Sequence, residues 1–252
     1  SESGQADDTV VVFLSDHGMP FPLAKTCLYH HSTRTPWMVR WPGKVKAGSH
    51  DSDHMISALD LLPTLLDIAE IDHPNGLEGR SFYEVLKGNK QPELDHVIKE
   101  YNESSGRRRH PMRAVQTKRF NYIFNPWAAG GRKFQAAGQG TLSYREMVAL
   151  AETDPATAKL LQQYDYRVVE EFFDIEKDPD NLNNLIDDPE YKEEIAAHRA
   201  MLGDFMEKTK DPVFAAFRKR EDTSYLDGFV EAQQEEAFRR RRVTPGRKPN
   251  SN

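Results

Sequence analysis

The sequence predicts an α/β protein in which a sheet sandwiched by helices is followed by a smaller α+β domain with an antiparallel sheet and a packed helix. Residues 9–14, TVVVFL, form a short run of β-branched and apolar residues, typical of a strand buried on both faces of a parallel sheet. Residues 54–71 have the broad apolar face of a helix. From about residue 93 the chain changes to strand-like segments rich in aromatic and β-branched residues.

Residues 1–92 are predicted to form the end of the first domain. The segment PWMVRW, residues 36–41, is expected to be a second strand closed by a Pro-Gly turn. In the predicted helix 54–71, Asp60 is the expected N-cap, and Pro63 then lies in the first turn, where its missing N–H costs nothing.

Residues 93–210 are predicted to form the smaller domain. HVIKEYN, MRAVQT, RFNYIFN and VVEEFFDI have the composition of strands, and the second and third are expected to form a hairpin that turns at residues 117–119. A helix packed on this sheet is predicted from apolar residues at helical spacing, namely Tyr191, Ile195, Leu202, Phe205 and Met206. Residues 211–252 are mostly charged and are expected to be a solvated tail or an extended arm against the body.

The composition excludes several classes of protein. With 252 residues, of which 38% are hydrophobic and 29% charged, the chain is typical of soluble globular proteins. Its net charge of −6 argues against nucleic acid as the main partner. No apolar stretch approaches the length needed to span a membrane. The single cysteine excludes an intrachain disulfide.

Polar residues gather directly after the first predicted strand, where ligands of open α/β sheets bind. Asp16 and His17 end the strand, and two more imidazoles, a lysine, a tyrosine and an arginine follow within twenty residues. Metal-assisted hydrolysis of an anionic ester needs ligands for a cation and positive groups that stabilise the leaving oxyanion. The segment therefore predicts a site for such a reaction.

The same segment resembles the second signature region of the sulfatases. The motif Asp16-His17-Gly18 is followed by Lys25, Tyr29, Arg34 and Pro36 in the spacing K-x3-Y-x4-R-x-P. Further blocks in the same order extend the resemblance over residues 7–210, and the sulfamidase (heparan N-sulfatase) branch is the most similar. These blocks are TPWMVRWPGKVKAG, HMISALDLLPTLLDIAEI, NGLEGRSF, RAVQTKRFNYIFN and EEFFDIEKDPDNLNNL. The resemblance implies that residues 1–92 are the carboxyl-terminal portion of an alkaline-phosphatase-like catalytic domain.

The resemblance also implies roles for individual residues. Asp16 and His17 would be ligands of a divalent cation, for which calcium is expected. Lys25 would be catalytic and would bind the substrate, contacting both the sulfate group and the leaving oxygen. Tyr29 and Arg34 would be structural in part, with Arg34 orienting nearby carboxylates or holding the loop.

His17 departs from the family, which more often has asparagine at this position. An imidazole is a poorer calcium ligand than an oxygen and favours manganese or zinc. The Asp16-His17 pair also resembles phosphonate monoester and phosphodiester hydrolases of the same superfamily. The metal, and the choice between sulfate and phosphate-type esters, therefore stay open.

Three further residues are candidates for substrate binding. His30 and His31 would point to opposite faces if they lay on a strand. One of them, His30, could then line the pocket. The alternative is that neither histidine lines it. Asn102 and Arg107 follow a predicted strand, in a loop that the resemblance places near the pocket mouth, where it could hold an anionic sugar. The alternative is a solvated basic loop.

The sequence lacks the family's nucleophile, a formylglycine made from cysteine in the pattern C-x-P-x-R. Cys27 lies in TCLYHH and is expected to be a loop thiol. We therefore expect this chain to be the carboxyl-terminal half of a sulfatase and to be inactive alone. Its expected partners are a sulfated sugar, the amino-terminal half of the same protein and possible further copies of itself. The family implies export to the periplasm, the exterior or a lysosome-like compartment. The alternative from another class is a non-catalytic partner that binds anionic glycans.

Overall fold

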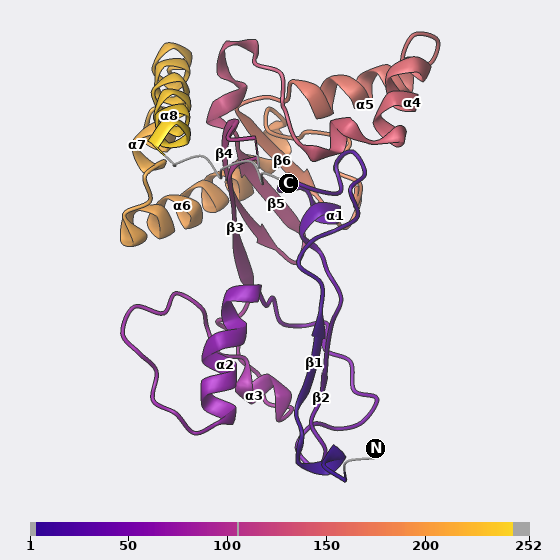
Figure 1. The fold of residues 1–252 in the computed structure, drawn as a ribbon, viewed down its shortest axis with the longest axis vertical. Helices are drawn as coiled ribbons and strands as arrows, with labels where there is room; N and C mark the ends of the chain where they lie inside the picture. The colour runs from indigo at the N-terminus through magenta and orange to yellow at the C-terminus, as the bar shows by residue number, and fades with distance from the viewer. Residues whose placement is uncertain (1–3, 105, 244–252) are drawn as a thin grey trace, which may run out of the picture.

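A computed structural model describes residues 4–104 and 106–243 of the chain, with side chains up to residue 240. Two parts are visible in Figure 1. One contains a pair of strands and the short helices α2 and α3, and the other contains a four-stranded sheet with helices on both sides. This mixture of helices and antiparallel sheets agrees with the predicted fold class.

The two strands expected in the first part are present as β1 (Val11–Leu14) and β2 (Trp37–Arg40). They pair antiparallel, and β1 has no other strand neighbour among the described residues. One face of this pair is open, because Val11, Phe13 and Met38 are 47%, 56% and 58% exposed. The prediction that residues 9–14 are buried on both faces of a parallel sheet is therefore wrong for the described part of the chain, which supplies no layer over that face.

The helix predicted over residues 54–71 is shorter than expected. A 3₁₀ turn, Ala58–Asp60, leads into α2 (Leu61–Ile68), and α3 (Tyr83–Leu86) follows. Ser57 caps the turn, whereas the buried Asp60 carboxylate accepts hydrogen bonds from the backbone N–H groups of Ser57 (2.8 Å) and Arg80 (2.7 Å). Asp60 directly precedes α2, as expected of its N-cap, but its side chain makes no capping hydrogen bond to α2 and instead fastens the following loop.

The predicted antiparallel sheet of the second part is confirmed. Its strands are β3 (His96–Glu103), β4 (Arg109–Thr117), β5 (Phe120–Phe124) and β6 (Glu170–Asp174), hydrogen-bonded in the order β3-β4-β5-β6. The hairpin between β4 and β5 turns at residues 117–119, as expected.

Helices cover the two faces of this sheet (Figure 1). On one face lie α6 (Lys192–Thr209), α7 (Phe214–Arg218) and the start of α8 (Thr223–Val243). The helix expected from the apolar spacing after Tyr191 is α6, and it buries Ile195, Leu202 and Met206. On the other face lie residues 27–29, the 3₁₀ segment η3 (Pro126–Gly131), α4 (Leu142–Leu150) and α5 (Pro155–Asp165).

The charged segment after residue 211 differs from the expected solvated tail or extended arm. Its helices α7 and α8 bury Phe217, Leu226, Val230 and Ala237, because apolar residues recur at helical spacing among the charged ones. The division of the chain at residue 93 stays a prediction; the backbone N–H of Met55 donates to the carbonyl of Leu94 (2.7 Å) across it.

Candidate functional site

The candidate site is built on residues 15–36, here called the site loop, which connect β1 to β2. Asp16 and His17 follow β1 directly, and their side chains are 82% and 41% exposed. His17 Nε2 lies 3.1 Å from the Asp16 carboxylate, and its Nδ1 lies 2.7 Å from the Gly18 carbonyl oxygen. The two predicted metal ligands are therefore adjacent and accessible.

These two side chains would supply only part of a metal site. Among the described residues, no three His, Cys, Asp or Glu side chains come together in a way that could hold a metal ion. A carboxylate and an imidazole fit a divalent cation as two ligands of a larger set. The remaining ligands would have to come from outside the described residues.

Gly18 brings the two ends of the site loop together. A Cβ at this position would lie 2.4 Å from the carbonyl oxygen of Ala24 and 2.7 Å from that of His31. Only glycine allows this approach of three backbone segments. Asp16 and His17 are thereby held next to the part of the loop that carries Lys25.

Lys25 is a cation of the site loop whose ammonium has no partner among the described residues. It lies between Leu23 and Thr26, which both adopt left-handed backbone conformations (φ 62° and 60°). Its half-buried side chain makes no hydrogen bond or ion pair with any residue that the structure describes. An unpaired ammonium held on a constrained turn is suited to contact an anion.

The site loop is fastened to the sheet of the second part through several of its residues. The Tyr29 hydroxyl donates to the Glu171 carboxylate (2.6 Å), and the backbone N–H of His30 donates to Asn181 Oδ1 (2.8 Å). The Leu28 carbonyl accepts from side chains of β3 and β5. The contacts with the second part therefore fix the conformation of the site loop.

Tyr29 is structural, in line with the role expected for it. Its hydroxyl and Asn125 Nδ2 (2.7 Å) are the donors to the Glu171 carboxylate, whose pKa is raised by burial. The Arg167 guanidinium lies 5.1 Å from the centre of the Tyr29 ring and also over the rings of Trp127 and Phe134. This buried cluster fixes the middle of the site loop.

His30 and His31 lie in a short helix, α1 (His30–Thr33), and the strand assumed for them is wrong. His30 is half-buried with Nδ1 3.3 Å from Gln116 Nε2, and burial, reinforced by the positive charges of Lys99 and Arg34, lowers its pKa to about 4. A neutral ring can hydrogen-bond to a substrate but brings no charge to it at neutral pH. His31 points elsewhere, to Asp180 (2.7 Å).

Arg34 does not orient a carboxylate within the part of the chain that the structure describes. Its side chain is exposed and makes no ion pair there, and its backbone N–H donates to the His30 carbonyl (2.9 Å) at the end of α1. The expectation that it holds the loop is met by its backbone only.

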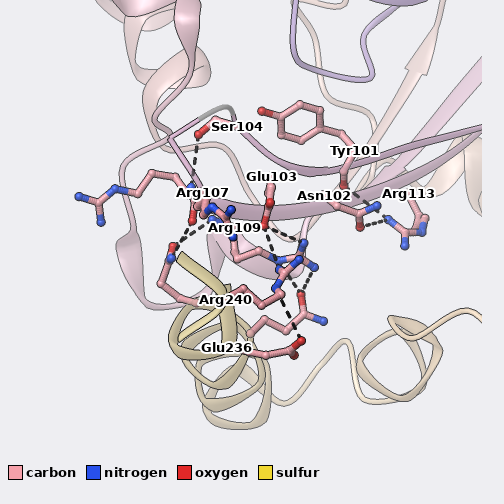
Figure 2. A network of polar contacts seen from close by, with 12 residues as sticks. Tyr101, Asn102, Glu103, Ser104, Arg107, Arg109, Arg113, Glu236 and Arg240 are labelled. Atoms are coloured by element: carbon pink, nitrogen blue, oxygen red, sulfur yellow. Dashed lines mark hydrogen bonds and ion pairs between the residues drawn. The ribbon is translucent and has the colours of Figure 1, made fainter. Parts of the chain in front are cut away.

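Asn102 and Arg107 lie at the other end of β3, where the β3–β4 loop meets α8 (Figure 2). Asn102 Oδ1 accepts from Arg113 Nη1 (3.0 Å), and Arg113 is paired with the buried Asp211. Arg107 has a left-handed backbone (φ 60°) and its carbonyl accepts from Gln234 of α8 (2.9 Å). Its guanidinium has no partner among the described residues. No contact joins this loop to Asp16 or Lys25 in that part of the chain.

Sequence reasoning missed the residues that hold the site loop, above all Lys99 of β3. Its ammonium donates to the Leu28 carbonyl (2.7 Å). One signal could have identified it: in a strand, Lys99 shares its face with Val97 and Tyr101, and a lone charged residue on an apolar face needs a partner. Glu171, which shares a face of β6 with Phe173, is a second charged residue on an apolar strand face.

Comparisons with known proteins agree on one family. Residues 17–127 match the family described as N-sulphoglucosamine sulphohydrolase, C-terminal. The chain is 28% identical over 222 residues to human N-sulphoglucosamine sulphohydrolase, covering 84% of this chain and 44% of the human protein. It is also 28% identical to an ulvan-active sulfatase of Formosa agariphila, covering 80% and 33%.

A solved structure supports the same relationship. A putative sulfatase from Bacteroides thetaiotaomicron superposes with a TM-score of 0.59 at 26% identity, covering 82% of this chain and 38% of that one. In all three comparisons the chain spans less than half of the relative's length.

Proposed function

We propose that this chain is the carboxyl-terminal part of a sulfatase and that the complete protein hydrolyses sulfate esters or N-sulfates on a glycosaminoglycan-type sugar. The observation that carries the proposal is the unpaired Lys25 ammonium on a loop that Gly18 packs against Asp16 and His17. The chain supplies this part of the site, and the nucleophile belongs to the rest of the protein.

The exposed apolar surface of the first part supports a missing portion of the same protein. On α2 the exposed residues are leucines, Leu62 (51%) and Leu65 (39%), whereas Pro63 and Thr64 are buried. This is the reverse of what a helix at a water-exposed surface presents. Together with the open face of β1 and β2, it is suited to packing against further layers of the catalytic domain.

The residues of this chain would act on the substrate in the following way. Lys25 contacts the sulfate and stabilises the negative charge that develops on the leaving atom. Asp16 and His17 provide two ligands for a divalent cation, which when bound would polarise the sulfate oxygens and lower the pKa of the nucleophile. Calcium is the expected ion, and the imidazole of His17 keeps manganese and zinc as alternatives.

The three further substrate-binding candidates receive different roles. Arg107, with its free guanidinium, would bind an anionic group of the sugar. Asn102 is already engaged by Arg113, so it would shape the loop or offer its amide N–H groups. His30, held neutral, would be restricted to a hydrogen bond.

Two other functions are kept because specific observations favour them. The Asp16-His17 pair favours a phosphonate or phosphodiester hydrolase, and the free arginine at residue 107 favours a non-catalytic binder of anionic glycans. Export follows from the family alone; within the described residues no helix is long and apolar enough to cross a membrane. Assembly into a homo-oligomer also remains a proposal.

The decisive experiment uses the complete protein isolated from its source. Its intact mass and a peptide map establish whether a C-x-P-x-R peptide with the formylglycine mass change is present. The protein is then incubated with an N-sulfated glucosamine, an O-sulfated sugar and a phosphonate monoester, with and without a chelator. Sulfate release that the chelator abolishes supports the proposal. Turnover of the phosphonate alone, or glycan binding without turnover, would replace it with the corresponding alternative.

A further inference from the structure

Lys99 is a buried cation outside the predicted site. It lies on β3 with 9% of its surface exposed, and its ammonium donates to the Leu28 carbonyl (2.7 Å), Thr33 Oγ1 (3.3 Å) and Gln116 Oε1 (2.9 Å). The three protons of the ammonium match three acceptors, and all three acceptors are neutral. No carboxylate pairs with Lys99 among the residues described.

A buried charge without a counter-ion is costly for the stability of a fold. Its removal from water is compensated only by hydrogen bonds, and an apolar residue of similar volume often serves stability as well or better. Two of the three bonds of Lys99 go to the site loop, at Leu28 and Thr33. The position of these bonds indicates that they fix this loop.

We propose that Lys99 is a positioning residue, which fixes the shape of the site loop between Lys25 and Arg34 from the sheet beneath it. The anchored Leu28 carbonyl lies three positions after Lys25, and Asn121 Nδ2 of β5 holds the same oxygen a second time (3.1 Å). Thr33 stands directly before Arg34 at the end of α1. This inference deepens the proposed function, on which it rests for the catalytic importance of Lys25.

The charge state of Lys99 gives this anchor a pH dependence. Burial lowers its pKa to about 7, and the neutral amine has two N–H donors for three acceptors, so one bond is lost as the pH rises. The titratable groups facing it are His30, neutral above a pKa of about 4, and Cys27, whose pKa burial raises. Of Lys99, His30 and Cys27, Lys99 is therefore the group whose charge changes between pH 6 and 8.

Because burial disfavours the charged form of Lys99, the folded state becomes more stable as the pH rises. In the unfolded chain Lys99 stays protonated up to about pH 10.4, whereas in the folded protein it releases its proton near pH 7. The unfolded state therefore binds more protons above pH 7, and the Lys99 contribution to the free energy of unfolding rises with pH. Opening of the site loop breaks the bonds to Leu28 and Thr33 and exposes the ammonium, so the closed loop is also favoured as the pH rises.

The test compares Lys99→Met with Lys118→Met in the complete protein. Lys118 is half-exposed and pairs with Asp53 on the surface, so its replacement is a matched control. Amide hydrogen exchange over residues 25–34 is expected to speed up about tenfold or more in Lys99→Met, as the loss of a bond to a charged group predicts, and to stay unchanged in the control. The kcat for a sulfate ester falls while KM changes little. Unchanged exchange in a folded Lys99→Met protein would overturn the inference.

A second measurement needs no variant and covers the case in which Lys99→Met fails to fold. Exchange of the same amides in the unaltered protein, corrected for the intrinsic effect of pH, is expected to slow between pH 6 and 8.5 relative to the amides of β5, because the closed loop favours the neutral amine. An exchange ratio between the site loop and β5 that does not change with pH would contradict the anchoring role of Lys99. If the exchange responds but the complete protein releases no sulfate, the proposed function fails and the anchoring role of Lys99 stands.

Discussion

The hydroxyl of Tyr29 donates a 2.6 Å hydrogen bond to the buried carboxylate of Glu171, which lies 142 positions further along the chain. This bond joins the site loop to β6. Lys99 and Asn121 join the same loop to β3 and β5. Because these side chains project from one face of the sheet, the residues that would meet the substrate take their positions from the smaller domain.

The first prediction concerns this bond. Tyr29→Phe removes one donor to Glu171 and leaves a buried carboxylate bonded to Asn125 alone. We expect the free energy of unfolding of the complete protein to fall by about 1.5–3 kcal/mol, the usual range for a hydrogen bond to a charged group. Urea unfolding measures it. Tyr166→Phe is the control, because Tyr166 is 37% exposed, and its effect should stay within about 0.5 kcal/mol. Equal stabilities of the two variants would show that the bond does not anchor the loop.

The second prediction concerns Gly18. In Gly18→Ala the new Cβ would be 2.4 Å from the Ala24 carbonyl oxygen, so backbone has to move. We expect a loss of about 1–3 kcal/mol, typical of overpacking, together with weaker metal binding, since Asp16 and His17 shift with the residue. Gly140→Ala, where the Cβ meets nothing within 4 Å, is the control. Unaltered stability and metal affinity in Gly18→Ala would contradict the close packing of the loop.

The regular elements could be predicted because their signals are local. The aromatic and apolar composition of β5 and the apolar spacing around Leu202 in α6 are properties of neighbouring positions. The site loop has no such periodicity. Its short helix α1 arises from packing on the sheet, and adjacent histidines in a polar stretch carried no helical signal.

The site residues also divide into those with a local sequence signal and those without one. Asp16, His17 and Lys25 could be selected because their chemistry and spacing are visible in one segment. Lys99 could be noticed only as a charged residue on an apolar strand face, and its contact with the Leu28 carbonyl 71 positions away could not be predicted, because a carbonyl has no residue type to recognise. The expected solvated tail was wrong because Leu226, Val230 and Ala237 recur at helical spacing within a charged segment, whose overall charge obscured this pattern.

The third prediction concerns catalysis. Lys25→Ala in the complete protein is expected to lower kcat for a sulfate ester by about 100-fold or more, the effect of removing a group that stabilises transition-state charge, with KM changing much less. Steady-state kinetics over a range of substrate concentrations separate the two constants. Lys44→Ala is the control, because Lys44 is exposed on the turn after β2. A loss confined to KM would limit Lys25 to ground-state binding, and an unchanged kcat/KM would remove it from the site.

The fourth prediction concerns the thiol of Cys27. The side chain is 3% exposed, and burial raises its pKa. Sγ donates to the Leu23 carbonyl oxygen (3.1 Å), so the protonated thiol is the form that the surrounding loop stabilises. Because the thiolate is the reactive species, labelling with iodoacetamide at pH 8 should be slow in the folded protein and become rapid only in denaturant.

Replacement of Cys27 tests by an activity measurement whether the thiol takes part in the reaction. In Cys27→Ser the hydroxyl can donate to the same Leu23 carbonyl, and we expect sulfatase activity of the complete protein to stay within about twofold of the unaltered protein, the range of a substitution that leaves the transition state untouched. Rapid labelling of the native protein at Cys27, accompanied by loss of activity that Cys27→Ser reproduces, would instead make Cys27 a reactive group. The nucleophile would then have to be sought in this chain.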